Sequence, residues 1–261
     1  NQDRIQVFDS YGVFKKKWTA LRDMDGSPLL GTDFLRPADI EVDAEGRLHM
    51  VDVGWPRAFL FDRNAFWIRS WGVYLKSGAP AFQRPFSLAI GPEGHVFILD
   101  SALHRVLEFD LAARPDQLLL AEWGSEGTAP GQFGTISDIE IDGEGNIYLS
   151  DWEMHAIHKF SPQGEFITRW GELGTFIGEF DRPLGMGIDA DNNIYVADSR
   201  NARIQKFDSD GNYLTSWGDR GIGIRQFATA HDVAIGPEGR IFVTDAGNDR
   251  VIAYQSQAAA P

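Results

Sequence analysis

The sequence predicts an all-β protein built from repeated four-stranded antiparallel sheets, and three observations carry this prediction. Short apolar runs recur along the chain with spacings of 48, 51, 47 and 47 residues. Each repeat holds four such runs, rich in Val, Ile and aromatic residues and separated by Gly, Asp and Asn, which is the chemistry of strands and tight turns. No segment keeps a 3.6-residue apolar period over about ten residues, so few helices are expected.

The first two strands of each repeat share a recurring pattern. The first strands are expected at residues 39–43, 87–91, 138–142, 185–189 and 232–236. A turn containing Gly or Asn follows, and the second strand then ends in an aspartate in every repeat: Asp52, Asp100, Asp151, Asp198 and Asp245. Because the carboxylate recurs in all five repeats, we expect it to accept backbone N–H groups of the following turn rather than to act in catalysis.

The third and fourth strands carry the large aromatic residues. Third strands are expected at residues 4–9, 57–62, 105–110, 156–160, 203–208 and 250–255. The fourth strands end in tryptophan at Trp18, Trp71, Trp123, Trp170 and Trp217. A sheet with two apolar faces has to be covered by its neighbours. We therefore expect these tryptophans to fill the layers between neighbouring sheets.

Four-stranded sheets at a period of 40–50 residues indicate the blades of a β-propeller. The strand count predicts five blades in a single domain over residues 1–255. Pairing of strand 13–18 with the three strands of residues 232–255 would close the ring and remove its open edges. Residues 256–261 are expected to form a flexible tail. The alternative is a six-bladed ring with an incomplete N-terminal blade.

Composition limits the possible partners and location. The 24 basic and 38 acidic side chains give a net charge of −14, which disfavours nucleic acid as a partner. There is no cysteine, so disulfides and thiolate chemistry are excluded. No apolar stretch approaches the roughly 18 residues of a membrane span. The missing initial Met and the lack of cysteine favour an extracytoplasmic location, either periplasmic or secreted.

The segment Arg182–Phe227 resembles an NHL repeat, and the other repeats follow the same pattern with more variation. The resemblance covers essentially the whole chain and implies a propeller, for which six blades are the norm in that family. It implies no single function, because NHL propellers include scaffolds, RNA-binding proteins, receptor sensor domains and one type of enzyme.

That enzyme is peptidylamidoglycolate lyase, which segments 100–110 and 230–254 resemble. The lyase holds its zinc with histidines that stand just before the first strands of three repeats. The counterparts in this chain are Phe86, Leu184 and His231, and a catalytic tyrosine of the lyase falls near Trp152. Since catalytic zinc takes three protein ligands, the resemblance implies that the zinc site is largely missing here.

Candidate binding residues lie on the loops that precede the first strands and on those that join the second and third strands. In propellers these loops share one face, where a rigid frame presents them to ligands. The predicted ligand-binding residues are Trp55, His104, Trp152, His155, Arg200 and His231. Exposed Trp with His and Arg nearby is typical of binding hot spots. The alternative for Trp55 and Trp152 is that each ring folds back over its own blade.

A metal site is a further hypothesis, although no cofactor is predicted. Asp39, Asp138 and Asp232 stand at equivalent positions in alternate repeats, and His231 adjoins the last of them. Converging oxygen ligands suit calcium, and a histidine would suit zinc. The alternative is that these aspartates cap the ends of strands.

Two functions follow from these features. The first is a non-enzymatic binding or scaffold propeller that recognises a peptide, a protein or a small ligand on its loop face. The second is a metal-dependent lyase or hydrolase related to peptidylamidoglycolate lyase. The oligomeric state stays open.

Overall fold

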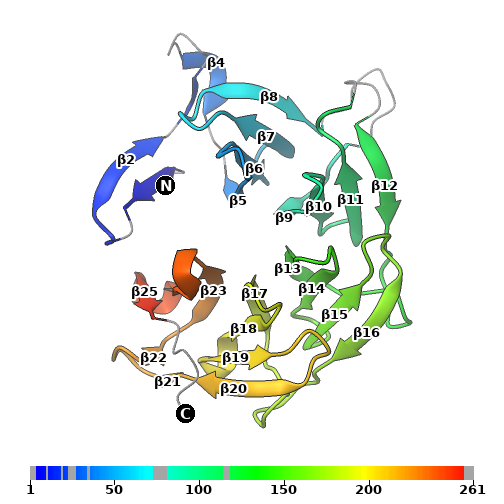
Figure 1. Cartoon of the computed structure of the whole chain (residues 1–261), viewed down its shortest axis with the longest axis vertical. Coiled ribbons are helices and arrows are strands. Elements are labelled where there is room, and N and C mark those ends of the chain that lie inside the picture. The colour runs from blue at the N-terminus through cyan, green and yellow to red at the C-terminus, as the bar shows by residue number, and fades with distance from the viewer. Residues whose placement is uncertain are drawn as a thin grey trace. The chain divides into compact units, whose positions relative to one another are not determined.

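The computed structural model describes residues 4–9, 11–18, 20–22, 28–33, 36–72, 81–113 and 118–255. Its strands are drawn in Figure 1. The chain divides into two compact units. The first comprises residues 1–90 and 94–122, and the second comprises residues 91–93 and 123–261. No helix of the described ranges is long and apolar enough to cross a membrane.

The first unit contains two four-stranded sheets and two strand pairs. The pairs are β1 (Ile5–Phe8) with β2 (Phe14–Trp18), and β3 (Ala20–Arg22) with β4 (Pro28–Asp33). One sheet runs β5 (Pro37–Val42), β6 (Leu48–Asp52), β7 (Arg57–Phe61) and β8 (Trp67–Trp71). The other runs β9 (Pro85–Ile90), β10 (Val96–Asp100), β11 (Arg105–Phe109) and β12 (Leu119–Trp123).

The second unit repeats the same plan. One sheet holds β13 (Ile136–Ile141), β14 (Ile147–Asp151), β15 (Ala156–Phe160) and β16 (Phe166–Trp170). The next holds β17 (Pro183–Ile188), β18 (Ile194–Asp198), β19 (Arg203–Phe207) and β20 (Tyr213–Trp217). The last holds β23 (Ala230–Ile235), β24 (Ile241–Asp245) and β25 (Arg250–Tyr254). Two short strands, β21 (Asp219–Arg220) and β22 (Gln226–Phe227), pair in parallel.

The predicted fold class is confirmed: the chain is all-β and consists of five propeller blades of antiparallel strands. Every predicted strand is present, in the predicted order within its blade. In the described residues the last blade has three strands, and β2 pairs with β1. Closure by strand 13–18 therefore stays a prediction, and the tail at residues 256–261 lies outside the described residues.

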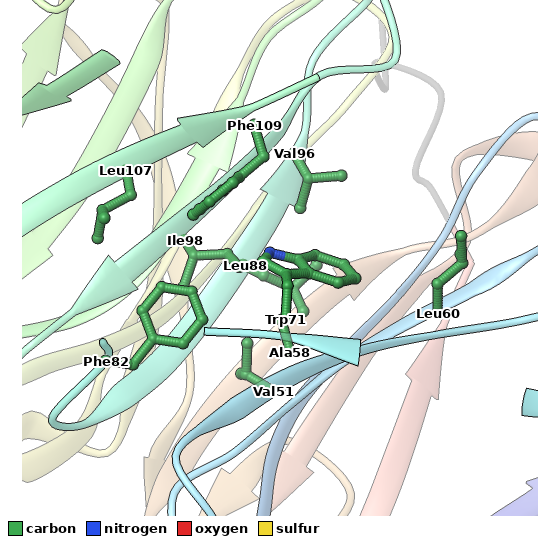
Figure 2. Close-up of a cluster of buried hydrophobic side chains, with 10 residues drawn as sticks. All are labelled: Val51, Ala58, Leu60, Trp71, Phe82, Leu88, Val96, Ile98, Leu107 and Phe109. Carbon is green, nitrogen blue, oxygen red and sulfur yellow. The ribbon is translucent and has the colours of Figure 1, made fainter. Parts of the chain in front are cut away.

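Large apolar side chains fill the layer between neighbouring blades, as the tryptophan pattern predicts. In the first unit, Trp71 is 4% exposed and packs with residues from both four-stranded sheets (Figure 2). The cluster consists of Val51, Ala58, Leu60, Trp71, Phe82, Leu88, Val96, Ile98, Leu107 and Phe109. Burial of this kind contributes about 25 cal/mol per Å² of apolar surface, so these layers are the main source of the fold's stability.

The other four repeat tryptophans are half-buried against the same kind of layer. Trp123 lies 4.7 Å from Phe160 between ring centroids, and Trp18 packs on the cluster of Met50, Phe59 and Phe61. Trp170 and Trp217 each pack on the core of the adjoining blade. The predicted packing role is confirmed for all five tryptophans.

The aspartate that ends each second strand is fully or almost fully buried and accepts backbone N–H groups. Asp52 accepts from Gly54 and Trp55 in the following turn, as predicted. It also accepts from Arg36, which precedes its own first strand. Asp151 likewise accepts amides from both loops, whereas Asp100, Asp198 and Asp245 accept described backbone amides only from the loop before the first strand. In every blade the aspartate thus fixes the loop that leads into the first strand.

Candidate functional site

Each first strand has a β-bulge at its second residue. The pairing register shifts there in all five blades. The residues at these points are Ala38, Phe86, Ser137, Leu184 and His231. Of these, Phe86, Leu184 and His231 are the positions that the resemblance gives as counterparts of zinc ligands. A bulge breaks the ladder and re-aims a side chain. The fold therefore presents one re-aimed side chain from each first strand, and only one of the five is a histidine.

His231 lies on β23 with its side chain exposed. Neighbouring protein atoms displace part of the water around the exposed ring and lower the pKa of the His231 imidazole below its usual value of 6.5, since desolvation disfavours the charged form. The ring is therefore neutral at pH 7. A neutral imidazole can accept a hydrogen bond or ligate a metal ion.

Two of the metal-candidate aspartates join neighbouring first strands. The Oδ2 atom of Asp39 accepts from the Leu88 amide and the Ser87 hydroxyl, both at 2.8 Å. The equivalent Oδ2 atom of Asp138 accepts from the Met186 amide at 2.6 Å. In both cases the other oxygen, Oδ1, accepts the amide of the next residue. Both carboxylates thus cap backbone N–H groups. This is the role that the sequence offered as the alternative to a metal site.

Asp232 adjoins the β17 backbone closely. A Cβ atom on Gly185 would come within 2.6 Å of the Asp232 Cα atom and 2.0 Å of its Oδ1 atom. Its Oδ1 atom accepts from the Val233 amide at 2.8 Å. Within the described ranges, no three His, Asp or Glu side chains converge as a metal site would require.

A tryptophan–arginine platform lies on the loop face of the second unit. The guanidinium of Arg182 lies over the Trp152 ring, with its Cζ atom 4.2 Å from the ring centroid. Trp152 follows β14, and Arg182 directly precedes β17 of the next blade. Both side chains are half-buried. Stacking leaves the N–H edges of the guanidinium directed away from the ring, and no other described residue accepts a hydrogen bond from them.

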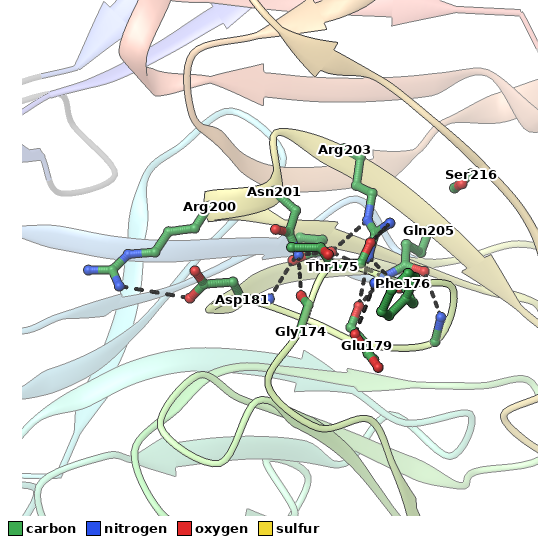
Figure 3. Close-up of polar contacts among 12 residues, drawn as sticks. Gly174, Thr175, Phe176, Glu179, Asp181, Arg200, Asn201, Arg203, Gln205 and Ser216 are labelled. Atoms are coloured by element: carbon green, nitrogen blue, oxygen red, sulfur yellow. Dashed lines mark hydrogen bonds and ion pairs between the residues drawn. The ribbon is translucent and has the colours of Figure 1, made fainter.

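Asp181 brings two further predicted residues to this platform. Its Oδ1 atom lies 3.9 Å from Nδ1 of His155 and 3.8 Å from Nη1 of Arg200. Figure 3 shows the Arg200–Asp181 contact beside the loop that precedes β17. The Nδ1 atom of His155 also accepts the Arg182 amide at 3.1 Å. Trp152, His155 and Arg200, chosen from sequence, therefore meet around Asp181 and Arg182.

The backbone at Arg182 differs from that at three of the four aligned positions; at the fourth, the Thr135 amide donates to Glu153. The aligned amides of Arg36, Arg84 and Thr229 each donate to the aspartate at the end of the second strand. The Arg182 amide donates to His155 instead, and the Asp181 amide donates to Asp198. Arg182 also has a φ of +56°. A non-glycine residue in this region carries strain, and such strain gathers at functional sites.

The remaining predicted site residues are not members of this cluster. Trp55 and His104 belong to the first unit. Trp55 is half-buried against Met50, Phe59 and Phe61, and the Arg57 guanidinium covers it at 4.2 Å. His104 is half-buried in a turn with a φ of +47°. No described contact joins His231 to the Trp152 platform.

Sequence reasoning missed Asp181 and Arg182, although a signal for them was present. Both residues stand directly before Pro183, which starts β17. An arginine also precedes the corresponding proline in two other blades, at Arg36 and Arg84. Because the Arg-Pro pair recurs in three blades, the sequence alone does not distinguish Arg182 from Arg36 and Arg84. Arg182 differs from the other two arginines because its amide donates a hydrogen bond to His155 of the preceding blade.

Comparison with known proteins gives a family match and distant relatives. Residues 180–207 match the model of the NHL repeat. A stretch of 99 residues, 37% of this chain, is 30% identical to peptidylglycine alpha-amidating monooxygenase of Rattus norvegicus. The corresponding protein of Mus musculus is 32% identical over 99 residues. These matches cover 10% of the length of each relative.

Solved structures share the fold at low sequence identity. Selenomethionine-substituted virginiamycin B lyase from Staphylococcus aureus has a TM-score of 0.63 and 14% identity, over 98% of this chain and 78% of that one. A chain of a nidogen/laminin complex has a TM-score of 0.65 and 16% identity, over 97% and 85%. The predicted resemblance is confirmed: this chain carries an NHL repeat at residues 180–207 within an all-β propeller fold.

Proposed function

We propose that this chain is a non-enzymatic binding propeller that recognises a peptide or another carboxylate-bearing ligand on its loop face. The observation that carries the proposal is the Arg182 guanidinium, stacked at 4.2 Å on Trp152 and with no described acceptor at its N–H edges. A planar guanidinium fork matches a carboxylate in a two-point hydrogen bond. The stacked ring holds the fork in one orientation before the ligand arrives, which lowers the ordering cost of binding.

The neighbouring groups favour a ligand with both signs of charge or with amide groups. Asp181 can accept an N–H donor, while His155 and Arg200 lie within 4 Å of its Oδ1 atom. A peptide terminus offers a carboxylate next to an amide N–H. An apolar side chain beside them would meet the uncovered part of the Trp152 ring.

A pool of N-acetylated tripeptides of random composition tests the proposal. We expect saturation-transfer NMR signals from the pool with free C-terminal carboxylates and much weaker signals from the same pool with amidated termini. Arg182→Gln should reduce the signal at least tenfold, because it removes the fork. Arg182→Lys should restore little of it, since lysine keeps the charge but loses the planar two-point contact.

Arg36→Gln is the matched control, because Arg36 holds the same position in its own blade and no described ring contacts it. This variant should bind the carboxylate pool as the unmodified chain does. Equal binding of both pools, or no change in Arg182→Gln, would contradict the proposal.

A metal-dependent lyase or hydrolase is the second candidate, and the similarity to an amidating monooxygenase supports it. In that case His231, open at its bulge and neutral at pH 7, is the expected ligand. Elemental analysis after dialysis against zinc or calcium distinguishes the two functions. The binding function predicts less than 0.1 metal ion per chain, with no change in His231→Ala. Stoichiometric metal that is lost in His231→Ala would favour the enzyme.

A further inference from the structure

The connection between the fourth strand of one blade and the first strand of the next is built three times in the same way. The three copies, residues 123–133, 170–180 and 217–227, align without gaps as Trp-Gly-x-x-Gly followed after five residues by Phe. The final phenylalanine of each copy, Phe133, Phe180 or Phe227, is fully buried. We name these segments the first, second and third copies of the loop.

Hydrogen bonds hold the tip of each copy in the same manner. In the second copy, the Glu179 carboxylate accepts the Phe176 amide at 2.9 Å, and the Gly174 amide donates to the Phe180 carbonyl at 3.1 Å. In the third copy, Gln226 takes the place of Glu179 and accepts the Gly223 amide at 3.1 Å. The first copy uses Gln132 for the Ala129 amide at 3.2 Å.

The copies differ in the side chains that they hold outward. The first copy exposes Thr128, Ala129 and Pro130. The second copy exposes large apolar residues: Leu173 at 65%, Phe176 at 76% and Ile177 at 63%. The third copy exposes Ile222 at 80% and Ile224 at 79%. Since the first copy forms with small or polar residues at its tip, the loop does not need the apolar side chains of the other two in order to fold.

The two copies with apolar tips are also held by an arginine. The Arg203 guanidinium donates to the carbonyls of Thr175, Phe176 and Glu179 (Figure 3). The Arg250 guanidinium donates to the carbonyls of Ile222, Gly223 and Gln226. The residue at the corresponding place behind the first copy is Ala156. The apolar tips are therefore fixed in position before any partner arrives, which lowers the ordering cost of association.

Arginines surround the two apolar tips. The short helix η1 (Ser199–Asn201) lies between them, because Asn201 donates to the Gly174 carbonyl and Arg220 donates to the Arg200 carbonyl. Arg200, Arg220 and Arg225 are exposed there, against the exposed acids Glu172 and Asp219. Arg200 lies 3.8 Å from Asp181, whereas Arg220 and Arg225 form no ion pair with any described residue. Protein interfaces are enriched in aromatic residues and Arg and depleted in Lys, and these loops contain no lysine.

We propose that the second and third copies of the loop, with η1 between them, form a docking surface for a protein partner whose binding segment combines apolar side chains with carboxylates. The apolar tips would enter apolar parts of the partner, and the arginines would pair with its carboxylates. Exposed arginine beside rigidly held apolar side chains is the composition of protein interfaces, so a protein segment is favoured over a lipid surface. The inference shares Arg200 with the loop-face cluster but does not use Trp152 or Arg182, and its test changes only the tips of the loops, so its failure can be told apart from failure of the proposed function.

Two labelled peptides of twelve residues test the docking surface by fluorescence anisotropy. One alternates Leu and Glu, and the other alternates Leu and Lys. We expect the Leu–Glu peptide to bind, and the Leu–Lys peptide to bind at least tenfold more weakly. The tip-exchange variant carries the residues of the first copy: Phe176→Ala, Ile177→Pro, Ile222→Thr and Ile224→Pro. It should weaken binding of the Leu–Glu peptide at least tenfold.

Proline fits at positions 177 and 224, because no described residue accepts a hydrogen bond from either amide. Ile167→Thr is the matched control, because Ile167 is 49% exposed on β16 and outside the loops; it should leave binding unchanged. Failure of the Leu–Glu peptide to bind, or equal binding by the tip-exchange variant, would overturn the proposal. The unmodified chain is also tested against phosphatidylcholine vesicles. Binding to these vesicles that is lost in the tip-exchange variant would indicate a lipid surface and would overturn the proposal.

Discussion

Replacing Asp198 with alanine is expected to lower the free energy of unfolding by about 3–5 kcal/mol, the usual cost of breaking a buried ion pair by removing one partner. The carboxylate is fully buried and accepts from the Asp181 amide at 2.8 Å, the Arg203 Nε atom at 2.7 Å and the Gln205 Nε2 atom at 3.1 Å. Asn201 donates to both of its oxygens. Alanine leaves all these donors without the acceptor, including a charged guanidinium. Urea unfolding measures the loss.

Asp208→Ala is the matched control, because Asp208 accepts two turn amides at the surface rather than a buried cation. Its loss should cost about 1 kcal/mol, as for ordinary hydrogen bonds. If Asp198→Ala costs no more than Asp208→Ala, the desolvation of the buried carboxylate already cancels its hydrogen bonds.

The loss of stability caused by Asp198→Ala is expected to depend on pH and to be larger in acid. Burial raises the pKa of the Asp198 carboxyl above its usual value, and the hydrogen bonds from Asn201, the Asp181 amide and Arg203 only partly oppose this. The folded state therefore binds this proton more tightly than the unfolded state does. The contribution of this tighter proton binding to the free energy of unfolding is fully present below the pKa of the carboxyl in the unfolded chain, about 3.8. It is lost as the pH rises through the higher pKa of the folded chain. The difference between the unmodified chain and Asp198→Ala should thus be larger at pH 4 than at pH 7.

The blade pattern could be predicted from sequence because each element has a local signal that recurs. Alternating apolar residues, turn residues and the tryptophan at the end of each fourth strand together predict the position of every strand. The recurring aspartate predicts an acceptor for backbone amides. What the pattern did not predict is the second set of donors to that aspartate. The Arg36 amide reaches Asp52 across 16 residues, and no local pattern encodes such a contact.

The candidate site was only partly predictable for a related reason. Trp152, His155 and Arg200 could be placed on loops from the repeat alignment. Their meeting depends on Asp181 and on the unusual backbone of Arg182, whose amide donates to His155 of the previous blade. A single aligned position therefore has different structures in different blades. The alignment can show that the residues are equivalent but cannot show which of them deviates.

Replacing Phe180 with alanine is expected to cost about 3–5 kcal/mol, the range for truncating a buried aromatic residue. Phe180 is fully buried, and its ring centroid lies 5.6 Å from that of Phe207. A Cβ atom on Gly171 would come within 2.5 Å of the Phe180 ring. The ring therefore lies directly against the backbone of the strand end, and its removal leaves a cavity that this backbone cannot fill without moving.

Phe176→Ala, four residues earlier in the same loop, is the matched control. Its side chain is 76% exposed, so the substitution should change the free energy of unfolding by no more than about 0.5 kcal/mol. Urea unfolding of both variants separates the two roles of phenylalanine in one loop: Phe180 stabilises the layer between blades, while Phe176 serves the docking surface. If Phe176→Ala lowers the free energy of unfolding by more than about 1 kcal/mol, the Phe176 ring stabilises the folded chain. The exposed tips would then no longer support the proposed docking surface.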